Sequence, residues 1–545
     1  MEAVKGETIF AGMAFGKLAF RMKDEEAIAS KSLGYEEEKK QFILARDKAI
    51  EATRALEVTA KEKLTPKDAE IVEAHLVMLQ DPDFNDLVEE GLKDGESAIE
   101  AVTQAGAKLE EMLKSTGDQY ISERAKDVEE ISGQIKANLT GRDASLSFSE
   151  PTILVTNNIT VSELLSLNKN ITGLALLDTG KTSHVSIVIR SLGIPALILT
   201  DRFDRGSEGK EGILDAIRGV LYSGYDLKFL ASMKDDKEHF EQEGQRLREY
   251  IFKPTVTADG IKTTIYANIS TPEEAKAAKD SGAEGIGLFR SEFIYMNSID
   301  YPSEETQFEA YKKAVQTMDG KPVVIRTFDI GSDKKASYFD LPKESNPALG
   351  YRSIRICEDR PELFLTQLKA LYRASAFGNL SIMIPMIISS SELDFTHGIC
   401  EKAMEELDKR KEKYDRGMKI GIMVETPAAA VTSDILAKKA AFFSIGTNDL
   451  SQYTLAIDRT NENLLKFFDP HHKAILRLIA LTVENGHKFH TPVSICGELA
   501  HDEKLLPFFL KIGVDHLSMS SSYILKTRES ISQIDTRKVE LSDYI

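Results

Sequence analysis

The feature that most constrains the fold is a series of eight short apolar runs in the second half of the chain. From about residue 260 these runs read TTIYANI, GIGLFR, VVIRTFDI, SIMIPMII, IGIMVETP, FFSIGTND, VSICGE and HLSMS, and helix-length segments separate them. Eight strand-helix units in about 285 residues are what a (β/α)8 barrel requires. The sequence therefore predicts a TIM barrel over residues 259–545.

The first half of the chain has two other patterns. Between about Ser30 and Leu139, apolar residues recur at three- and four-residue steps, which is typical of amphipathic helices. Examples are Phe42, Ala45 and Ala49 in one stripe, and Ala98, Val102, Ala105 and Met112 in another. After Pro151 the short runs TILV, GLALLD, PALIL and GVLYS indicate a small α/β unit. We expect residues 1–22 and 145–224 to form this unit, residues 23–144 to be a helical insertion, and residues 225–258 to be a helical linker.

Composition excludes several classes of protein. The chain carries 87 acidic and 69 basic residues, a net charge of -18, which would repel the phosphate backbone of a nucleic acid. Its three cysteines, Cys357, Cys400 and Cys496, are widely spaced, which favours a reducing cytoplasm over a disulfide framework. No run of about 18 apolar residues occurs, so we expect no membrane insertion. The sequence predicts a cytoplasmic protein.

Polar residues follow the apolar runs at the positions where a TIM barrel carries its chemistry. These residues are Arg290, Arg326, Glu425, Asn448, Asp449 and Cys496. Two arginines at one barrel mouth suit a small polyanion, because each guanidinium can form two parallel hydrogen bonds to a phosphate or carboxylate. Glu425 and Asp449, with Asn448 adjacent, offer hard oxygen ligands for Mg²⁺. A protonated Cys496 thiol could give a proton to a carbanion or enolate.

His184 stands out in the small α/β unit. The stretch DTGKTSHVSIVIRSLGIPAL reads as a glycine turn followed by a helix, with His184 in the first helical turn. Free backbone N–H groups and the helix dipole favour an anion there, so a phosphoryl group on the imidazole would be stabilised. The alternative reading is a structural capping histidine. Gly180-Lys181-Thr182 also resembles the end of a P-loop, but Ala175 stands where that motif needs glycine.

Several of these segments together resemble the enzyme I family of the sugar phosphotransferase system. The segments are TSH and RSLGIP around His184, then GLFRSEF, IRTFDIGSDK, GIMVETPAAA, FFSIGTNDLSQYTLAIDR and CGELA, in the order of the family. The resemblance implies that the α/β unit is a phosphohistidine domain and that the barrel binds phosphoenolpyruvate. It implies the following roles: phosphoenolpyruvate binding by Arg290, Arg326, Asn448, Asp449 and Arg459, Mg²⁺ binding by Glu425 and Asp449, phosphorylation of His184, and protonation of the enolate to pyruvate by Cys496.

The same resemblance implies two protein partners. In this family the phosphoryl group passes to the small carrier protein HPr, which docks on the inserted helical subdomain. The segments EAHLVMLQDPDF and ERAKDV resemble that docking surface, and they contain His75, Met78, Leu79, Asp81 and Arg124. An acidic helical face around Asp81 and Asp83 would attract a carrier with a basic rim around its histidine. The second implied partner is another copy of the chain, as a homodimer formed through the barrel.

Two alternatives remain open on the sequence. Phosphoenolpyruvate synthase and pyruvate phosphate dikinase share both signatures, but they need an ATP-grasp domain, and only about 145 residues precede the histidine domain here. A non-catalytic paralogue acting as a regulator is the other alternative. It is motivated by departures from the family pattern near the histidine, such as Lys181 and Val161.

Overall fold

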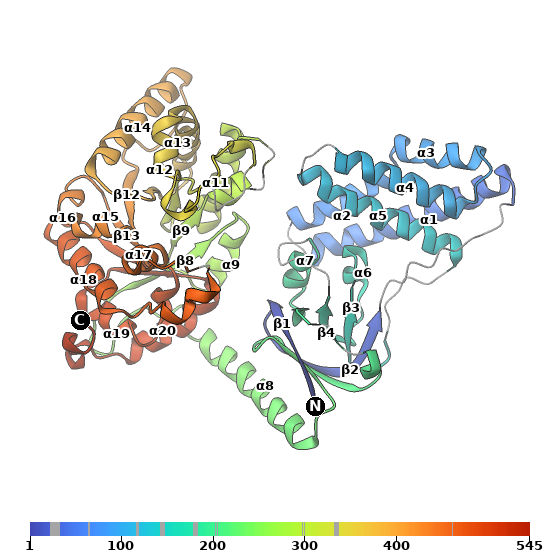
Figure 1. Ribbon diagram of the computed structural model, residues 1–545, viewed down its shortest axis with the longest axis horizontal. Helices are drawn as coiled ribbons and strands as arrows, with labels where there is room; N and C mark the ends of the chain where they lie inside the picture. Colours follow the sequence, from blue (N-terminus) through green and yellow to red (C-terminus); the bar gives the residue numbers. More distant parts are fainter. Residues whose placement is uncertain are drawn as a thin grey trace. The chain divides into compact units, whose positions relative to one another are not determined.

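The computed structural model describes the whole chain except residues 22–32, 64–65, 116–118, 142–147, 158, 178–183, 202, 204, 297, 299, 332–336 and 460. The chain divides into two compact units, Met1–Glu241 and Gln242–Ile545. The division falls within the long helix α8 (Leu227–Arg248) (Figure 1). Each unit therefore has its own core and is described by itself.

The first unit is built on a closed seven-stranded sheet with the order β1-β5-β4-β3-β2-β6-β7. Its strands are β1 (Glu2–Phe10), β2 (Met13–Arg21), β3 (Thr152–Thr156), β4 (Ile171–Leu176), β5 (Ala196–Leu199), β6 (Glu211–Asp215) and β7 (Val220–Ser223). Strands β2 to β5 pair in parallel, whereas β1, β6 and β7 pair antiparallel to their neighbours. Parallel neighbours need crossover connections, and α6 (Val161–Ser166) and α7 (His184–Leu192) supply two of them. A short 3-10 turn, η1, covers Arg205–Ser207.

In the described part of the chain between β2 and β3, five helices form the predicted helical insertion (Figure 1). They are α1 (Tyr35–Lys63), α2 (Pro66–Leu79), α3 (Pro82–Lys93), α4 (Ala98–Ser115) and α5 (Gln119–Thr140). The predicted apolar stripes meet in one core, where Phe42, Ala45 and Ala49 pack with Val102 and Ala105. Met112 was expected in this core, but it lies in the last turn of α4 and is 56% exposed.

The second unit contains the predicted barrel. Its eight parallel strands pair in chain order and close on themselves, β8 with β15. They are β8 (Thr264–Ile269), β9 (Ile286–Arg290), β10 (Val323–Arg326), β11 (Leu380–Ile384), β12 (Lys419–Val424), β13 (Phe443–Gly446), β14 (Val493–Cys496) and β15 (His516–Met519). Each of the eight apolar runs coincides with one of these strands to within one residue at its start, so the predicted fold class is confirmed. The strands are apolar on both faces because one face packs inside the barrel and the other against the helices.

Helices and short 3-10 turns follow the strands of this barrel. The helices are α9 (Glu274–Asp280), α10 (Glu292–Met296), α11 (Glu304–Met318), α12 (Ile354–Asp359), α13 (Pro361–Ser375), α14 (Ser390–Arg410), α15 (Pro427–Val431), α16 (Ser433–Leu436), α17 (Thr447–Leu455), α18 (Lys473–Lys488), α19 (Leu506–Ile512) and α20 (Ile524–Gln533). The 3-10 turns are η2 (Ser337–Phe339), η3 (Pro347–Leu349), η4 (Glu462–Phe467), η5 (Glu498–His501), η6 (Ser521–Tyr523), η7 (Thr536–Lys538) and η8 (Leu541–Asp543). Among the helices that the structure describes, none is both long and apolar enough to cross a membrane.

Helix α20 fastens the end of α8 to the barrel. The guanidinium of Arg528 is buried and donates hydrogen bonds to the carbonyl oxygens of Tyr250 (2.8 Å), Ile251 (3.2 Å) and Gly282 (2.6 Å). Next to it, Glu529 accepts a hydrogen bond from Arg246 of α8 at 3.0 Å. A buried guanidinium held by several hydrogen bonds in this way is costly to disturb. The last turn of α8 and the segment after it therefore belong rigidly to the second unit.

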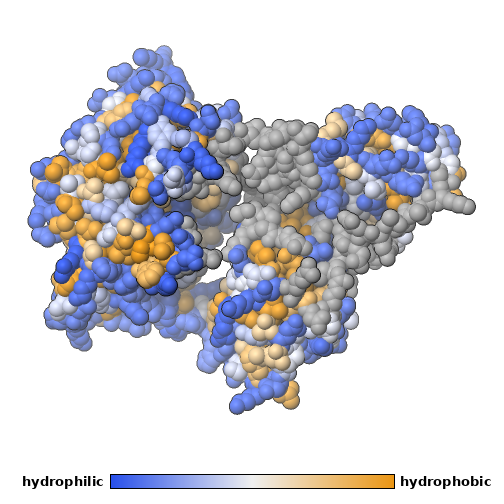
Figure 2. Space-filling model, in the orientation of Figure 1, coloured by the Kyte–Doolittle hydropathy of each residue, from blue (hydrophilic) through white to orange (hydrophobic). Residues whose placement is uncertain are grey.

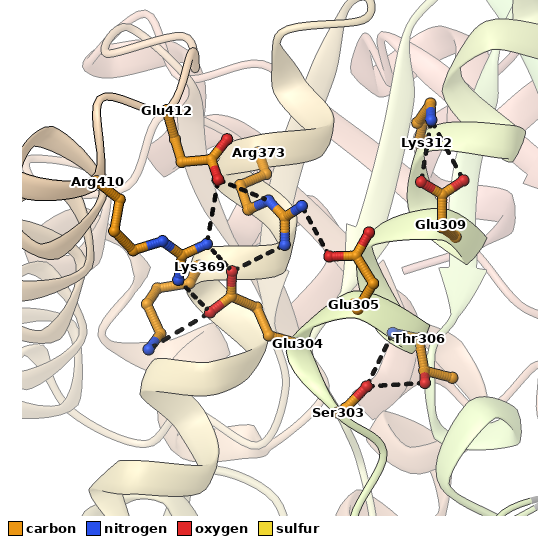
Figure 3. Close-up of polar contacts among 10 residues, drawn as sticks. All are labelled: Ser303, Glu304, Glu305, Thr306, Glu309, Lys312, Lys369, Arg373, Arg410 and Glu412. Carbon is orange, nitrogen blue, oxygen red and sulfur yellow. Dashed lines mark hydrogen bonds and ion pairs between the residues drawn. The ribbon is translucent and has the colours of Figure 1, made fainter.

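A carboxylate shared by three cations ties helices α11, α13 and α14 together on the outside of the barrel (Figure 3). Glu304, in the first turn of α11, accepts from Arg373 of α13 at 2.9 Å and from Arg410 of α14 at 2.6 Å. Lys369 of α13 lies 3.5 Å from the same carboxylate. Burial opposes the charge of Glu304, but the hydrogen bonds from Arg410 and Arg373 outweigh it and lower the pKa to about 2. The network thus stabilises the barrel through one ionised side chain.

We expect Glu304→Gln to lower the free energy of unfolding of the second unit by about 2 kcal/mol at pH 7, after allowance for solvent screening. Because the pKa of Glu304 is lowered by folding, its contribution is complete above its ordinary pKa. It is lost as pH falls toward the folded value of about 2. Urea unfolding measured between pH 8 and pH 3 should therefore show a constant difference from wild type that shrinks below about pH 4.5.

The matched control is Glu309→Gln. Glu309 pairs with Lys312 in the same region (Figure 3) but is 56% exposed, so its loss should change stability by no more than about 0.5 kcal/mol. Equal losses at the two positions would contradict the assignment.

Candidate active site at the mouth of the eight-stranded barrel

Arg290 and Arg326 lie next to each other at the barrel mouth. Each is the last residue of its strand, β9 and β10, and the strand register pairs the two directly. Arg326 is only 6% exposed, whereas Arg290 is half-buried. Two neighbouring guanidinium groups at the carboxyl ends of parallel strands form a site for an anion with several oxygens.

The charge of Arg326 is balanced by carboxylates from several elements. Its Nη2 pairs with Glu292 of α10 and lies 3.4 Å from Oδ2 of Asp329. Burial works against this charge, but Glu292, Asp329, Glu425 and Asp449 together hold the pKa of Arg326 above its usual value. The buried Nε of Arg326 has no hydrogen-bond partner among the described residues. One donor of this arginine is thus free for a ligand.

Arg352 and Asp329 form a second arginine–carboxylate pair, next to Arg326. Arg352 donates to both oxygens of Asp329, at 2.9 and 2.8 Å, and the hydroxyl of Ser353 hydrogen-bonds the same carboxylate. All three side chains are buried. Ser353 has a φ of 53°, which is unfavourable for a residue with a side chain. The loop after β10 therefore accepts backbone strain in order to bring Arg352 and Ser353 to Asp329.

Glu425 and Asp449 add negative charge to the mouth after strands β12 and β13. Glu425 directly follows β12 and is 1% exposed, and its Oε1 accepts the backbone N–H of Met386 at 2.7 Å. Burial, followed by the negative charges of Asp449 and Asp329, raises the pKa of Glu425 above its ordinary range. A cation bound beside such a carboxylate stabilises its ionised form.

The segment after β13 carries the remaining predicted residues of the mouth. Asn448 and Asp449 lie in the first turn of α17, and Oδ1 of Asn448 accepts the backbone N–H of Glu498 at 3.3 Å. Arg459, beyond the end of α17, reaches back to Asp449 at 3.3 Å and remains 38% exposed. The structure therefore brings Arg290, Arg326, Glu425, Asn448, Asp449 and Arg459 to one end of one barrel.

Cys496 ends β14 and lies inside the barrel with Leu288, Met383 and Met423. Its thiol donates to the carbonyl oxygen of Ile445 at 3.4 Å. Burial raises the pKa of Cys496 to about 11. The next residue, Gly497, has a φ of 109°, and a Cβ there would lie 2.5 Å from Oγ1 of Thr447. Only glycine lets the chain turn here while keeping a protonated thiol at the mouth.

His184 lies in the first unit, as the first residue of α7. The helix begins where the sequence predicts, after β4, so the free N–H groups of its first turn are available near this residue. Lys181 and the rest of residues 178–183 lie outside the described residues, as does the side chain of His184. The backbone alone therefore agrees with the predicted position of the histidine at a helix start.

The residues predicted to dock a partner have different environments. His75 and Leu79 are completely buried, so their side chains do not form part of an exposed docking surface. The ring of His75 lies 3.3 Å from Asp127 and 3.8 Å from Glu130 of α5, and these acids raise its pKa against the effect of burial. Met78 and Asp81 are half-buried. The side chain of Arg124 lies outside the described part of the chain.

Three residues of the mouth were missed by the sequence reasoning. Glu292 follows β9 by two positions, and its place in GLFRSEF was a usable signal. Arg352 and Ser353 had no such signal, because they lie in the long connection after β10 rather than at a strand end. Only the path of that connection brings them to Asp329.

The chemical capacity of the mouth follows from this arrangement. Cationic and anionic side chains both line it, and a thiol that remains protonated at neutral pH lies at its inner wall. The described residues include no cluster of three or more His, Cys, Asp or Glu that could hold a metal ion. A small polyanion that contributes its own oxygen ligands is the kind of molecule that this site fits.

Comparison with known proteins identifies the class. Residues 5–124, 148–219 and 244–536 match the N-terminal, mobile and phosphoenolpyruvate-binding domains of phosphoenolpyruvate-utilising enzymes. The fold and site thus define an enzyme of the phosphoenolpyruvate-utilising class. The match over residues 5–124 also disfavours the alternative with an ATP-grasp domain, because the helical insertion is part of the family's own N-terminal domain.

Comparison with individual proteins identifies the family within this class. The phosphoenolpyruvate-protein phosphotransferase of Bacillus sp. (strain S) is 38% identical over 98% of this chain and 93% of that protein. The protein of the same name from Bacillus subtilis (strain 168) is 36% identical over 99% of this chain and 96% of that protein. A solution structure titled enzyme I (nEIt) covers 44% of this chain and 99% of its own, at 28% identity and a TM-score of 0.38. The chain belongs to the phosphoenolpyruvate-protein phosphotransferase family, which confirms the resemblance drawn from its motifs.

The buried position of Cys496 makes a prediction about thiol reactivity. A pKa of about 11, against an ordinary value of about 8.5, leaves roughly 300-fold less thiolate at pH 7.5 than in an unhindered cysteine. Iodoacetamide should therefore alkylate Cys496 in the native protein at least about 100-fold more slowly than in the urea-unfolded chain. Peptide mass spectrometry over time measures both rates. Alkylation of the native thiol at the rate of a free cysteine would contradict this environment.

Proposed function

We propose that the chain transfers the phosphoryl group of phosphoenolpyruvate to His184, releases pyruvate, and then passes the group to the carrier protein HPr. The observation that carries this proposal is the buried Arg326 beside Arg290, with Cys496 on the inner wall of the same mouth. Phosphoenolpyruvate offers a phosphate and a carboxylate to the arginines and an enol carbon to the thiol. Few other small polyanions would use all three groups.

In the proposed complex, the residues of the mouth bind and orient phosphoenolpyruvate. Arg290 and Arg326 grip its anionic oxygens, and the free Nε of Arg326 gives one of these hydrogen bonds. Asn448, Asp449 and Arg459 complete the binding group on the side of α17. Positioning and charge neutralisation account for most of the catalysis of phosphoryl transfer.

The transfer itself is a displacement at phosphorus. A ring nitrogen of His184 attacks, the P–O bond to the enol oxygen breaks, and its electron pair remains on the enolate. The enolate carbon then takes the proton of the Cys496 thiol, which gives pyruvate, and water later reprotonates the thiolate. His184 belongs to the first unit and the mouth to the second, so the proposal requires the two units to move relative to each other.

The family implies Mg²⁺, and Glu425 and Asp449 are the residues that would hold it. A cation fits between these two residues. Without one, burial and the negative charges of Asp449 and Asp329 disfavour the ionised form of Glu425, and a bound cation would offset both effects. Two carboxylates suffice for Mg²⁺, which usually keeps several waters and binds substrate oxygens. The bound ion would draw negative charge from the phosphate and enolate oxygens of the substrate.

The carrier protein would dock on the helical insertion. Asp83, Asp86 and Glu90 are exposed along one side of α3, and Val77 at the end of α2 is 67% exposed. This acidic face with an apolar contact fits a small carrier that has a basic rim around its histidine. Met78, Asp81 and Arg124 remain part of the proposed surface, whereas the burial of His75 and Leu79 removes their side chains from it.

We also propose a homodimer formed through the barrel. Apolar side chains reach the surface in both units (Figure 2). On the second unit they include several in the connections that follow β10 to β13: Leu349, Ile388, Val431, Ile435 and Phe467, each more than 40% exposed. Such side chains at one end of a barrel are typical of an interface between subunits.

The central test of the function is transfer of label from phosphoenolpyruvate. With ³²P-phosphoenolpyruvate and Mg²⁺, the wild-type chain should take up an acid-labile, base-stable label that moves to HPr on addition of the carrier. His184→Ala should take up no label because the acceptor is gone. Filter binding and gel autoradiography measure both steps. A wild-type chain that takes no label would refute the proposal and favour a non-catalytic regulator.

The two units should be separable by mutation. Cys496→Ala or Arg326→Ala should reduce labelling from phosphoenolpyruvate by at least about 100-fold, since each removes a group used only at the mouth. Both variants should still accept a phosphoryl group on His184 from phospho-HPr, because that step needs only the first unit. Circular dichroism establishes that the variants are folded. Loss of both reactions in a folded variant would show that the two steps share one site.

A further inference from the structure

Two chain segments at the barrel mouth are joined at their far ends by a hydrogen bond between side chains. One segment runs from the end of α17 to the start of α18 and carries Arg459, and the other runs from Cys496 through η5 to Asp502. Nε2 of His471, at the end of the first segment, lies 2.6 Å from Oδ2 of Asp502, at the end of the second. The two side chains are 35% and 24% exposed, so solvent screens this pair only in part.

Asp502 is a rigid anchor for this pair. Its Oδ1 accepts the backbone N–H groups of Lys504 at 2.9 Å and Leu505 at 3.3 Å, and its own N–H donates to the carbonyl oxygen of Leu499. The adjacent ring of His501 stacks on Tyr523, with ring centroids 3.8 Å apart. Contacts from both sides thus fix the carboxylate that faces His471.

The near end of the second segment is also fastened, to the first turn of α17. Asn448 of α17 accepts the N–H of Glu498, and Oγ1 of Thr447 donates to the carbonyl oxygen of Cys496 at 3.1 Å. Arg459 has weaker attachments, an N–H bond to Gln452 at 3.2 Å and the contact with Asp449. The position of Arg459 therefore depends on how the rest of its segment is held.

We propose that His471 and Asp502 are positioning residues for the phosphoenolpyruvate reaction, because the hydrogen bond between them holds the segment that presents Arg459 to the substrate phosphate. The inference rests on the proposed function and adds to it a contact outside the mouth. Among the described residues, no hydrogen bond or ion pair joins His471 to Arg290, Arg326, Asn448, Asp449 or Arg459. The contact with Asp502 restricts the segment before the substrate binds, so Arg459 loses less conformational entropy when phosphoenolpyruvate binds.

The size of the expected effect follows from the exposure of the pair. A partly exposed charged hydrogen bond contributes about 1 kcal/mol, which corresponds to about fivefold in affinity. The effect should fall on binding of phosphoenolpyruvate, where Arg459 meets the phosphate. It should not reach the acceptance of a phosphoryl group by His184 from phospho-HPr, which takes place on the other unit.

The test compares His471→Phe and Asp502→Asn with wild type in the labelling assay with phosphoenolpyruvate. Each variant should raise KM for phosphoenolpyruvate about five- to tenfold, with kcat within about twofold of wild type and unchanged uptake from phospho-HPr. His471→Arg, which again provides an N–H donor to Asp502, should recover most of the loss. A merely structural role in the barrel would lower kcat as well as raise KM, and His471→Arg would not reverse the loss.

A matched control is available in the same barrel. His487 pairs with Asp515 at 3.0 Å with similar exposure, but Asp515 precedes β15 and so lies at the opposite end of the strands. His487→Phe should leave KM unchanged. Wild-type KM in both variants, or equal effects at His471 and His487, would overturn the inference alone, because wild-type labelling would still support the proposed function. Absence of labelling in the wild-type chain would overturn both.

Discussion

The balance of charge around Arg326 is the constraint on which the rest of the site depends. A guanidinium that is almost fully buried is stable only when carboxylates surround it, and here Glu292 and Asp329 lie closest. Asp329 in turn needs Arg352 and Ser353. Removing any member would leave a buried charge without its partner. The mouth is therefore built as one cluster, and the barrel provides the strand ends that bring its members together.

This cluster also explains where the backbone is unusual. Ser353 and Met386 both have positive φ values, 53° and 60°, and each delivers a hydrogen bond to a carboxylate of the mouth. Gly497 has a positive φ beside the thiol. Strain of this kind persists only where surrounding contacts repay it. At these three positions the strained backbone holds the carboxylates and the thiol of the mouth in place, which agrees with a site that binds and orients a charged ligand.

Much of the fold could be predicted because local patterns control it. Each of the eight apolar runs became a strand, since a strand buried on both faces must be continuously apolar. The arginines, carboxylates and thiol at the ends of these runs met at one mouth for the same reason. Arg352 could not be found this way, because it comes 26 positions after Arg326 and the loop between them has no period to follow. His75 and Leu79 were expected on a surface, but packing of α2 against α5 and the core buries them.

The sequence by itself determined the eight strands, the helical insertion, the motifs of the family, and the residues that each strand end presents. These depend on spacing along the chain, which a linear pattern records. The tertiary structure decided which of those residues are buried, which carboxylates balance Arg326, and which distant segments His471 and Asp502 join. Such relations depend on distances between residues far apart in the chain, and only the closure of the barrel sets those distances.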